Sequence, residues 1–192
     1  MTRRTMLYAF GAAVVLLVEV GALIGSQAGA PFAPVEGWAP ARRPDMVAFA
    51  LAVLGCCALG FLQRFPTTAA IVATAAYVGF AVLDYELGMF LPPMVAIFAL
   101  VAWQHRSLVS ILCTGASLAA AASWVGHRAA TIQTPGVALL TWVAFGTVLA
   151  MFFLLPLLGA EILRARVLLR ALEADTLSRA PRGTMPPDES QT

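Results

Sequence analysis

Residues 136–159 of this chain read GVALLTWVAFGTVLAMFFLLPLLG, an apolar run without a single charged side chain. A helix that crosses a bilayer needs about 20 such residues. The same character recurs in earlier stretches, at Met6–Ser26, Met46–Leu62, Pro66–Leu83, Met89–Trp103 and Leu108–Gly126. The pattern predicts an all-α, polytopic membrane protein with six transmembrane helices over residues 1–159.

The composition of the whole chain agrees with lipid as the main solvent. Of the 192 residues, 60% are hydrophobic and only 11% are charged, whereas an average soluble domain has about 25% charged residues. A water-soluble fold of this length lacks the interior volume to bury so much apolar surface. We therefore expect a multi-pass protein of the cell membrane, with lipid as its surroundings and no contact with nucleic acid.

The six stretches differ in length. About 17 residues is the lower limit for a spanning helix, and the second stretch lies close to it. The fourth is short and opens with Pro92 and Pro93, so whether it spans completely is left open. The remaining four stretches satisfy the limit and are expected to cross the membrane.

The positions of the arginines predict the orientation. With an even number of spans, most arginines fall on one side of the membrane, which the positive-inside rule makes cytoplasmic. These arginines are Arg3, Arg4, Arg64, Arg106, Arg164, Arg166, Arg170, Arg179 and Arg182. Both termini are expected there. The opposite side carries Glu36, Asp84 and Glu86, with Arg42, Arg43 and Arg128 as exceptions to the rule.

The chain changes character after Gly159. Residues 160–180 mix charges with leucines and predict a cytoplasmic amphipathic helix, followed by a disordered polar tail at 181–192. The alternating three- and four-residue spacing of a coiled-coil seam is followed by Ile162, Ala165, Leu169, Leu172 and Thr176. Only two heptads fit, and the alternative to helix pairing is anchoring on anionic lipid through the arginines.

Glu19 is an acid within the first apolar stretch. An ionisable group at that depth is a functional-site hypothesis, here ligand or proton sensing; the alternative is a neutral carboxyl group that bonds across a helix interface. In a predicted outer connection, Asp84 and Glu86 flank Tyr85. This acidic and aromatic cluster suits a cation or a cationic ligand, although a solvated loop explains it equally well.

Motifs for catalysis are missing from the sequence. It contains no glycine-rich phosphate loop, no Gly-x-Ser-x-Gly and no His-Glu-x-x-His. The two histidines, His105 and His127, fall in connections on opposite sides of the membrane. We therefore expect no enzymatic activity, no cofactor and no metal site.

A further pattern runs through residues 45–175. A basic turn, Gln63-Arg64-Phe65-Pro66, leads into an Ala- and Val-rich helix. A Pro-led helix follows, from Leu91-Pro92-Pro93 to Ala102-Trp103-Gln104-His105-Arg106, and two more spans precede the charged exit helix. This order resembles the N-terminal membrane-sensor region of actinobacterial-type two-component sensor histidine kinases. The resemblance implies a membrane sensor that transmits signals through its exit helix.

Kinases of that family continue into a helix with a phosphoacceptor histidine and then into an ATP-binding domain. No histidine follows His127 here, so we expect no kinase core. The leading interpretation is a stand-alone sensor-like or regulatory module that acts through helix–helix contacts, as a homodimer or with a membrane sensor kinase. The alternatives are a small transporter or permease subunit that uses Glu19, and a structural membrane subunit.

Overall fold

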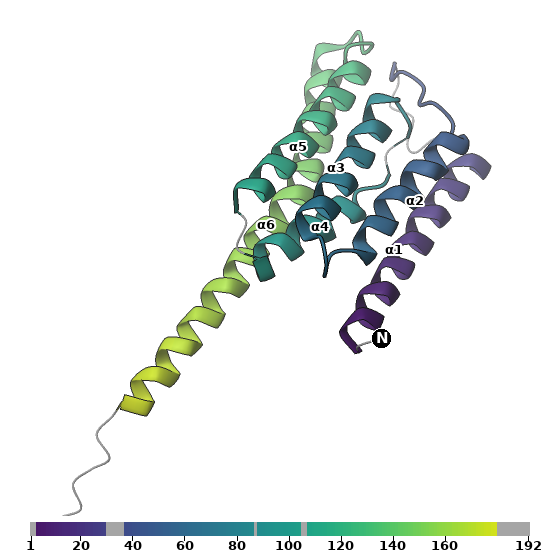
Figure 1. Ribbon diagram of the computed structural model, residues 1–192. Coiled ribbons are helices and arrows are strands. Elements are labelled where there is room, and N and C mark those ends of the chain that lie inside the picture. The colour runs from purple at the N-terminus through teal and green to yellow at the C-terminus, as the bar shows by residue number, and fades with distance from the viewer. Residues whose placement is uncertain (1–2, 30–36, 87, 105–106, 180–192) are drawn as a thin grey trace, which may run out of the picture.

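The fold is a bundle of helices (Figure 1), seen in a computed structural model that describes residues 3–29, 37–86, 88–104 and 107–179. Within these ranges there are six helices: α1 (Arg3–Ala28), α2 (Met46–Gly60), α3 (Pro66–Val82), α4 (Leu91–Gln104), α5 (Ser107–Ala129) and α6 (Pro135–Arg179). The described residues form no strand, apart from one isolated bridge between Arg42 and Tyr85. The predicted all-α class is confirmed.

Three of the helices are long and apolar enough to cross a membrane, namely α1, α5 and α6. The other three are apolar but shorter, with 15, 17 and 14 residues in α2, α3 and α4. At 1.5 Å per residue they measure roughly 21–26 Å, less than the ~30 Å hydrocarbon core. Six spanning helices were predicted, and length and composition support three of them.

The stretch of α3 was expected to be long enough to span, and the helix is one residue shorter than that stretch. Its helix ends at Val82, and Asp84 follows with φ of 61° in the left-handed region. That conformation is uncommon for a residue other than glycine and is incompatible with a continuing right-handed helix. The predicted stretch ended at Leu83, just before this residue, so the bounds of α3 agree within one residue and only its length falls short of the hydrocarbon core.

Local chemistry sets the beginnings of α2 and α3. The Asp45 carboxylate accepts hydrogen bonds from the N–H groups of Val47 and Ala48, at 2.9 and 3.2 Å, and so caps α2. Pro66 occupies the first turn of α3. At this position the missing N–H of proline costs nothing, because it has no partner within the helix.

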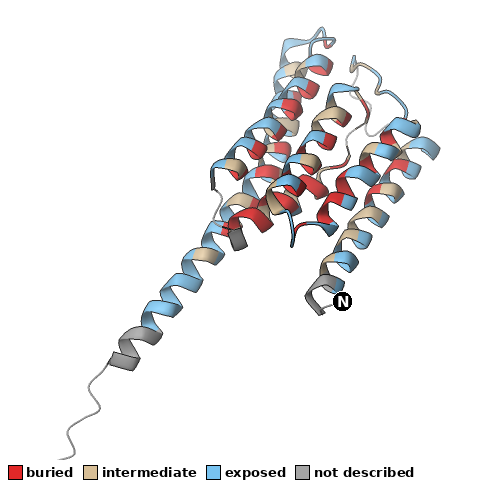
Figure 2. Cartoon of the chain, in the orientation of Figure 1, coloured by how far each residue is buried: buried red, intermediate tan, exposed pale blue. Residues whose placement is uncertain are grey.

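The core lies where the short helices meet the long ones. α3 packs on α2, α4 and α5, while α4 also packs on α6, and α1 lies mainly against α2. Burial is concentrated on the facing sides of the helices, and the outward sides are exposed (Figure 2). Much of the interior is alanine, including Ala70, Ala73 and Ala96. Such small residues allow the close helix approach that is typical of membrane bundles.

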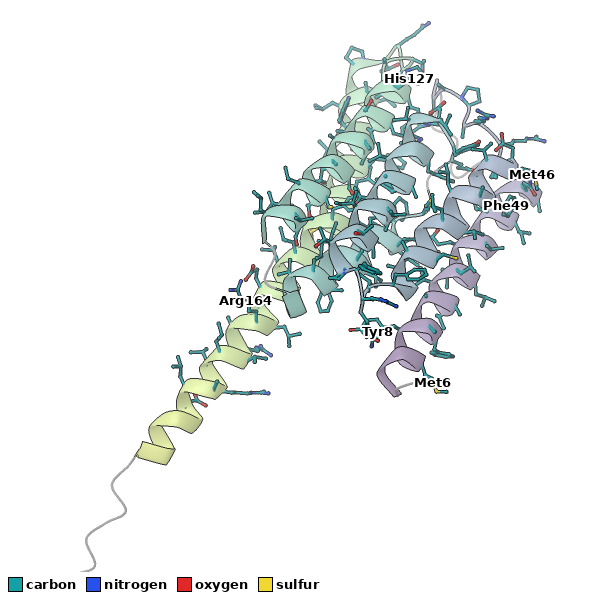
Figure 3. All side chains as sticks on the ribbon, viewed as in Figure 1. Met6, Tyr8, Met46, Phe49, His127 and Arg164 are labelled. Atoms are coloured by element: carbon teal, nitrogen blue, oxygen red, sulfur yellow. The ribbon has the colours of Figure 1, made fainter. Side chains whose placement is uncertain are left out.

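The bundle has two different ends. The loop end is formed by the connections at residues 37–45, 83–90 and 130–134, and the turn end by the short connection at residues 61–65. Figure 1 shows that α1 begins at the turn end and that α6 leaves the bundle there. His127 marks the loop end in Figure 3, and Arg164 marks the departing part of α6.

The longest element is α6, with 45 residues and a length of about 68 Å. It continues through Pro156 as one helix. Burial stops at Ala160, and from Glu161 to Glu173 every residue is exposed except the half-buried Arg164. The helix does not break at Gly159; the change from packed to exposed side chains falls within α6. The tail expected at 181–192 lies outside the described residues.

Candidate functional site

Glu19 lies on α1, about 13 Å along the axis from the helix end at Ala28. Its side chain is 4% exposed, and its carboxylate accepts hydrogen bonds from the N–H groups of Met89 at 2.9 Å and Leu91 at 3.1 Å. Leu91 is the first residue of α4. A carboxylate at this place satisfies N–H groups that a helix leaves unpaired and balances the positive end of its dipole.

The chain just before α4 enters the bundle without being helical. We call it segment 84–90; its residue 87 is outside the described part. Tyr85 and Met89 are each 1% exposed, and Met89, like Asp84, has a positive φ, of 65°. Gly55 on α2 makes room for this segment, since a Cβ there would lie 2.8 Å from the Met89 Cε.

Buried backbone that is not helical requires the protein to satisfy its polar groups in another way. In segment 84–90 the Trp124 Nε1–H donates a hydrogen bond of 2.8 Å to the Tyr85 carbonyl oxygen. Glu19 accepts from Met89 and Leu91. Side chains of α1 and α5 thus hold the two halves of the segment, which explains why a buried acid is needed in α1.

Arg128, near the end of α5, is a buried cation with a side chain only 2% exposed. Its Nη2 pairs with the Asp84 carboxylate at 2.9 Å, and its Nη1 donates to the Ala39 carbonyl at 2.9 Å. The guanidinium also lies 4.2 Å from the centroid of the Trp124 ring. A charge taken out of water must be paired, and this pairing joins two connections of the loop end, through Ala39 and Asp84, to the end of α5.

A second polar cluster surrounds Asp45. The Tyr85 hydroxyl donates to its carboxylate at 2.5 Å, and Arg42 forms an ion pair with it at 2.6 Å. The hydrogen bond from Tyr85 is the largest cause of the low pKa of Asp45, about 2, and Arg42 lowers the pKa further. The backbone N–H of Arg42 also donates to the Asp84 carbonyl at 2.9 Å.

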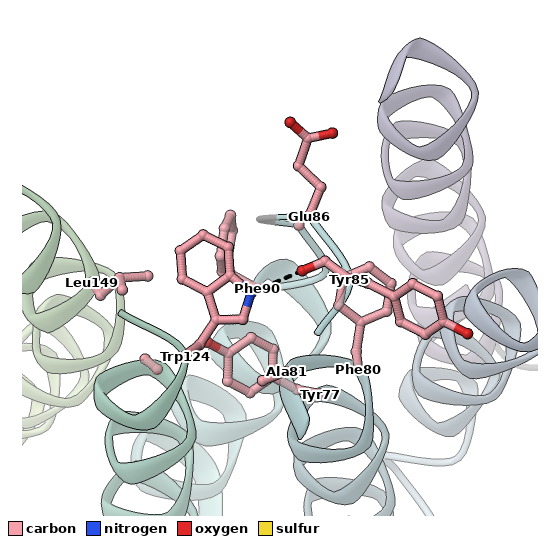
Figure 4. Close-up of a pocket in the computed structure, with 10 residues that line it drawn as sticks. Tyr77, Phe80, Ala81, Tyr85, Glu86, Phe90, Trp124 and Leu149 are labelled. Atoms are coloured by element: carbon pink, nitrogen blue, oxygen red, sulfur yellow. Dashed lines mark hydrogen bonds between the residues drawn. The ribbon is translucent and has the colours of Figure 1, made fainter. Parts of the chain in front are cut away.

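A small cleft opens beside segment 84–90 (Figure 4). Its walls carry five aromatic side chains, from Tyr77, Phe80, Tyr85, Phe90 and Trp124. Glu86 also lines it, and in Figure 4 its side chain extends away from the rings. The room that the centre of a water molecule can reach is about 10 Å³, enough for roughly one water. Sites for drug-sized ligands measure about 300–1,000 Å³, so the cleft fits only a small group.

The predicted ligand-sensing residues meet on this one segment. Asp84 and Glu86 belong to it, and Glu19 binds its far end. The sequence suggested these residues separately and gave no sign that α1 contacts the start of α4. Arg128 was noted only as an exception to the charge rule. Its position on the side that carries Glu36, Asp84 and Glu86 was the available signal that it has an acidic partner.

The predicted helix-pairing residues lie far from the loop end, on the projecting part of α6. The side chains of Ile162, Ala165, Leu169 and Leu172 are all exposed there. Thr176 lies within α6, but its side chain is outside the described part of the structure. The expected pair between Glu161 and Arg164 is present, with an N–O distance of 3.6 Å.

Among the described residues, no group of three or more His, Cys, Asp or Glu side chains is placed to hold a metal ion. Comparison of the chain with protein-family models, with curated proteins and with solved structures finds no match.

Proposed function

We propose that this chain is an integral membrane sensor-like or regulatory module without kinase activity. It transmits changes at its loop end to its exit helix, the part of α6 that projects from the bundle. The observation that carries this proposal is the continuity of α6 from the loop end to beyond the bundle. This helix begins at Pro135, directly after a loop-end connection, packs on α4 and α5, and continues unbroken beyond the bundle. A continuous helix transmits a shift or rotation along its length without loss at a flexible joint.

The contacts at the loop end give this helix an input. The Thr131 hydroxyl, four residues before α6, donates to the Gly37 carbonyl at 2.7 Å. Within the bundle α6 packs on α4, whose first turn is bound by Glu19. A displacement of segment 84–90 therefore changes the support of α4 and, through it, the position of α6. Helix displacements of about 1–2 Å are a common form of such switching.

The membrane position follows from charge and shape. α1, α5 and α6 cross the bilayer, and α2, α3 and α4 lie within it between them as further spans. The turn end and both termini are cytoplasmic, because most arginines are on that side. In support, α1 begins and α6 departs at the same end of the bundle (Figure 1).

The output of the module is association through the projecting part of α6, with a second copy or with a membrane sensor kinase. Replacing Leu169 and Leu172 together with Glu puts two charges into the predicted seam and is expected to abolish association while leaving membrane insertion intact. The matched control replaces Val167 and Ala171 with Glu. These two exposed residues lie roughly opposite the seam, since each residue advances the helix by about 100°.

The measurement is disulfide crosslinking in membranes. Single cysteines are placed at successive positions from Ile162 to Thr176 in a chain that lacks Cys56, Cys57 and Cys113. Crosslinks that recur at three- and four-residue spacing support a paired helix. Unchanged crosslinking in the Leu169→Glu, Leu172→Glu variant would contradict pairing through this seam.

One observation favours a second candidate function, a small transporter or permease subunit. Segment 84–90 is non-helical backbone beside the buried acid Glu19, and transporters bind ions and substrates where unwound backbone lies beside such groups. Glu19→Gln separates the two functions. The measurement is proton flux into vesicles, followed with a pH-sensitive dye. If Glu19 carries the proton, the parent chain shows flux and the Glu19→Gln variant loses it. If the chain is a sensor module, neither protein shows flux and the variant keeps its association.

A further inference from the structure

We propose that the connection at residues 37–45 is a strap that couples α1 and α2 mechanically to α6, and that Trp38 is its coupling residue. The coupling itself stands on the contacts of the strap with the helices. Its role as a regulator of the exit helix rests on the proposed sensor function.

The strap links two parts of the bundle that the helices do not join directly. Figure 1 shows α1 and α2 on one side of the bundle and α5 and α6 on the other, with α3 and α4 between them. Among the helical residues that the structure describes, the pair α1 and α2 contacts α3 and α4 but neither α5 nor α6. A movement of the first pair therefore has a direct route to α6 only through the strap.

One end of the strap is fastened to α5 and α6. The ring of Trp38 is half-buried, and its centroid lies 4.9 Å from that of Phe145 on α6 and 5.9 Å from that of Trp124 on α5. Such centroid distances are typical of favourable aromatic pairs. Next to this ring, Arg128 Nη1 donates a hydrogen bond of 2.9 Å to the Ala39 carbonyl oxygen. The start of the strap is thus held between the two helices.

The other end of the strap is fastened to α1 and α2. The Gln27 Nε2 group of α1 donates a hydrogen bond of 2.8 Å to the Pro44 carbonyl oxygen, and Asp45 caps α2. Between the two ends, the N–H of Arg42 donates to the Asp84 carbonyl oxygen at 2.9 Å. Because both ends are fastened, a displacement of α1 and α2 relative to α5 and α6 acts on the strap.

The sequence of the strap makes its backbone stiff. Pro40 and Pro44 each fix φ at about −65°, and each restricts the residue before it to extended conformations. A chain with few free torsions absorbs little of a displacement between its ends. The displacement therefore passes to Trp38 and, through the ring contact with Phe145, to α6.

The first experiment measures how α2 and α6 are placed relative to each other. Spin labels are attached to cysteines that replace the exposed Met46 and Leu139, in a full chain without native cysteines, and electron–electron resonance gives the distribution of distances between them. We expect Trp38→Ala to shift or broaden this distribution by about 2 Å, the size of helix displacements in switching. The matched control Phe10→Ala, an exposed aromatic residue on α1, leaves it unchanged.

The outcome against the proposal is a parent-like distribution in folded Trp38→Ala protein. Trp38→Phe keeps a ring and should stay close to the parent chain; an equal broadening in this variant would overturn the role of the ring contact. If Trp38→Ala does not fold, Thr131→Val decides. It removes the hydroxyl that donates to the Gly37 carbonyl at 2.7 Å and so loosens the same end of the strap, and a parent-like distribution in it overturns the coupling.

The crosslinking scan at residues 162–176 then separates the strap from the proposed function. A loosened strap that changes both the distance between α2 and α6 and the crosslinking pattern supports regulation of the exit helix. A changed distance with an unchanged pattern keeps the coupling and rejects its regulatory role. A paired exit helix in a chain whose distances do not depend on the strap keeps the proposed function and rejects the coupling.

Discussion

At the scale of single residues, the contact of Glu19 with the start of α4 determines what its replacement does. Glu19→Ala leaves the Met89 and Leu91 N–H groups buried without an acceptor, which costs ~1–3 kcal/mol for a buried group left unpaired. Glu19→Gln retains one amide oxygen as acceptor and should lose less. Thermal unfolding in detergent measures both, and equal melting temperatures for the three proteins would rule out this capping role.

The pair between Arg128 and Asp84 gives a second residue-scale prediction. Asp84→Asn keeps an acceptor and tolerates the left-handed backbone, but it removes the charge that compensates the buried guanidinium. We expect a loss of ~1–3 kcal/mol, at the lower part of that range because Asp84 itself is 34% exposed. Denaturant unfolding measures it, with Asp188→Asn in the C-terminal tail as a control that should change nothing.

The low pKa of Asp45 predicts a dependence of stability on pH. The pKa is about 2 in the folded chain, against a usual value of 3.8. Ionised Asp45 therefore stabilises the fold fully above about pH 4, and this contribution is lost as the pH falls toward 2. Thermal unfolding between pH 6 and pH 3 should show a steeper loss for the parent chain than for Asp45→Asn. Tyr85→Phe removes the hydrogen bond that is the largest cause of the low Asp45 pKa. The melting temperature of this variant should therefore depend less steeply on pH than that of the parent chain.

At the scale of elements, α6 combines a packed half and an unsupported half. Residues from Glu161 to Glu173 are exposed except for the half-buried Arg164, and the apolar ones include Val167, Leu168 and Leu169. A helical segment without tertiary contacts opens easily. We expect fast amide hydrogen exchange over this segment in dilute detergent and slower exchange at concentrations where the exit helices pair. Fast exchange at every concentration would mean that nothing covers this surface in the purified protein.

The helix bounds show which local signals were sufficient. The α2 start follows from the Asp45 cap, and the α3 start from Pro66; both signals act within one turn of chain and are visible in the sequence. The fourth apolar stretch was expected from Met89, but α4 begins at Leu91, because Met89 has a positive φ and its N–H is bonded to Glu19. An apolar residue fits a helix or a buried non-helical segment equally well, so composition cannot distinguish them.

At the scale of the whole molecule, the predicted topology can be tested by labelling with a membrane-impermeant thiol reagent in intact cells. Cysteines replace Ala130 at the loop end, Phe65 at the turn end and Ala171 on the projecting part of α6, all exposed, in a chain without native cysteines. We expect labelling of position 130 only, because an even number of spans puts the other two inside. Labelling at 65 but not at 171 would show that α2 and α3 do not form a spanning hairpin.

Hydropathy, charge and capping act locally, so the sequence by itself determined the all-helical class, the apolar helices and the change of character after Gly159. The tertiary structure decided how far α2, α3 and α4 extend. It also decided that segment 84–90 enters the bundle and that residues from several elements form the cleft. Glu19 bonds to residues 70 and 72 positions away, and Arg128 to one 44 positions away. Such contacts depend on how the helices pack against one another, and no pattern within one turn of chain encodes them.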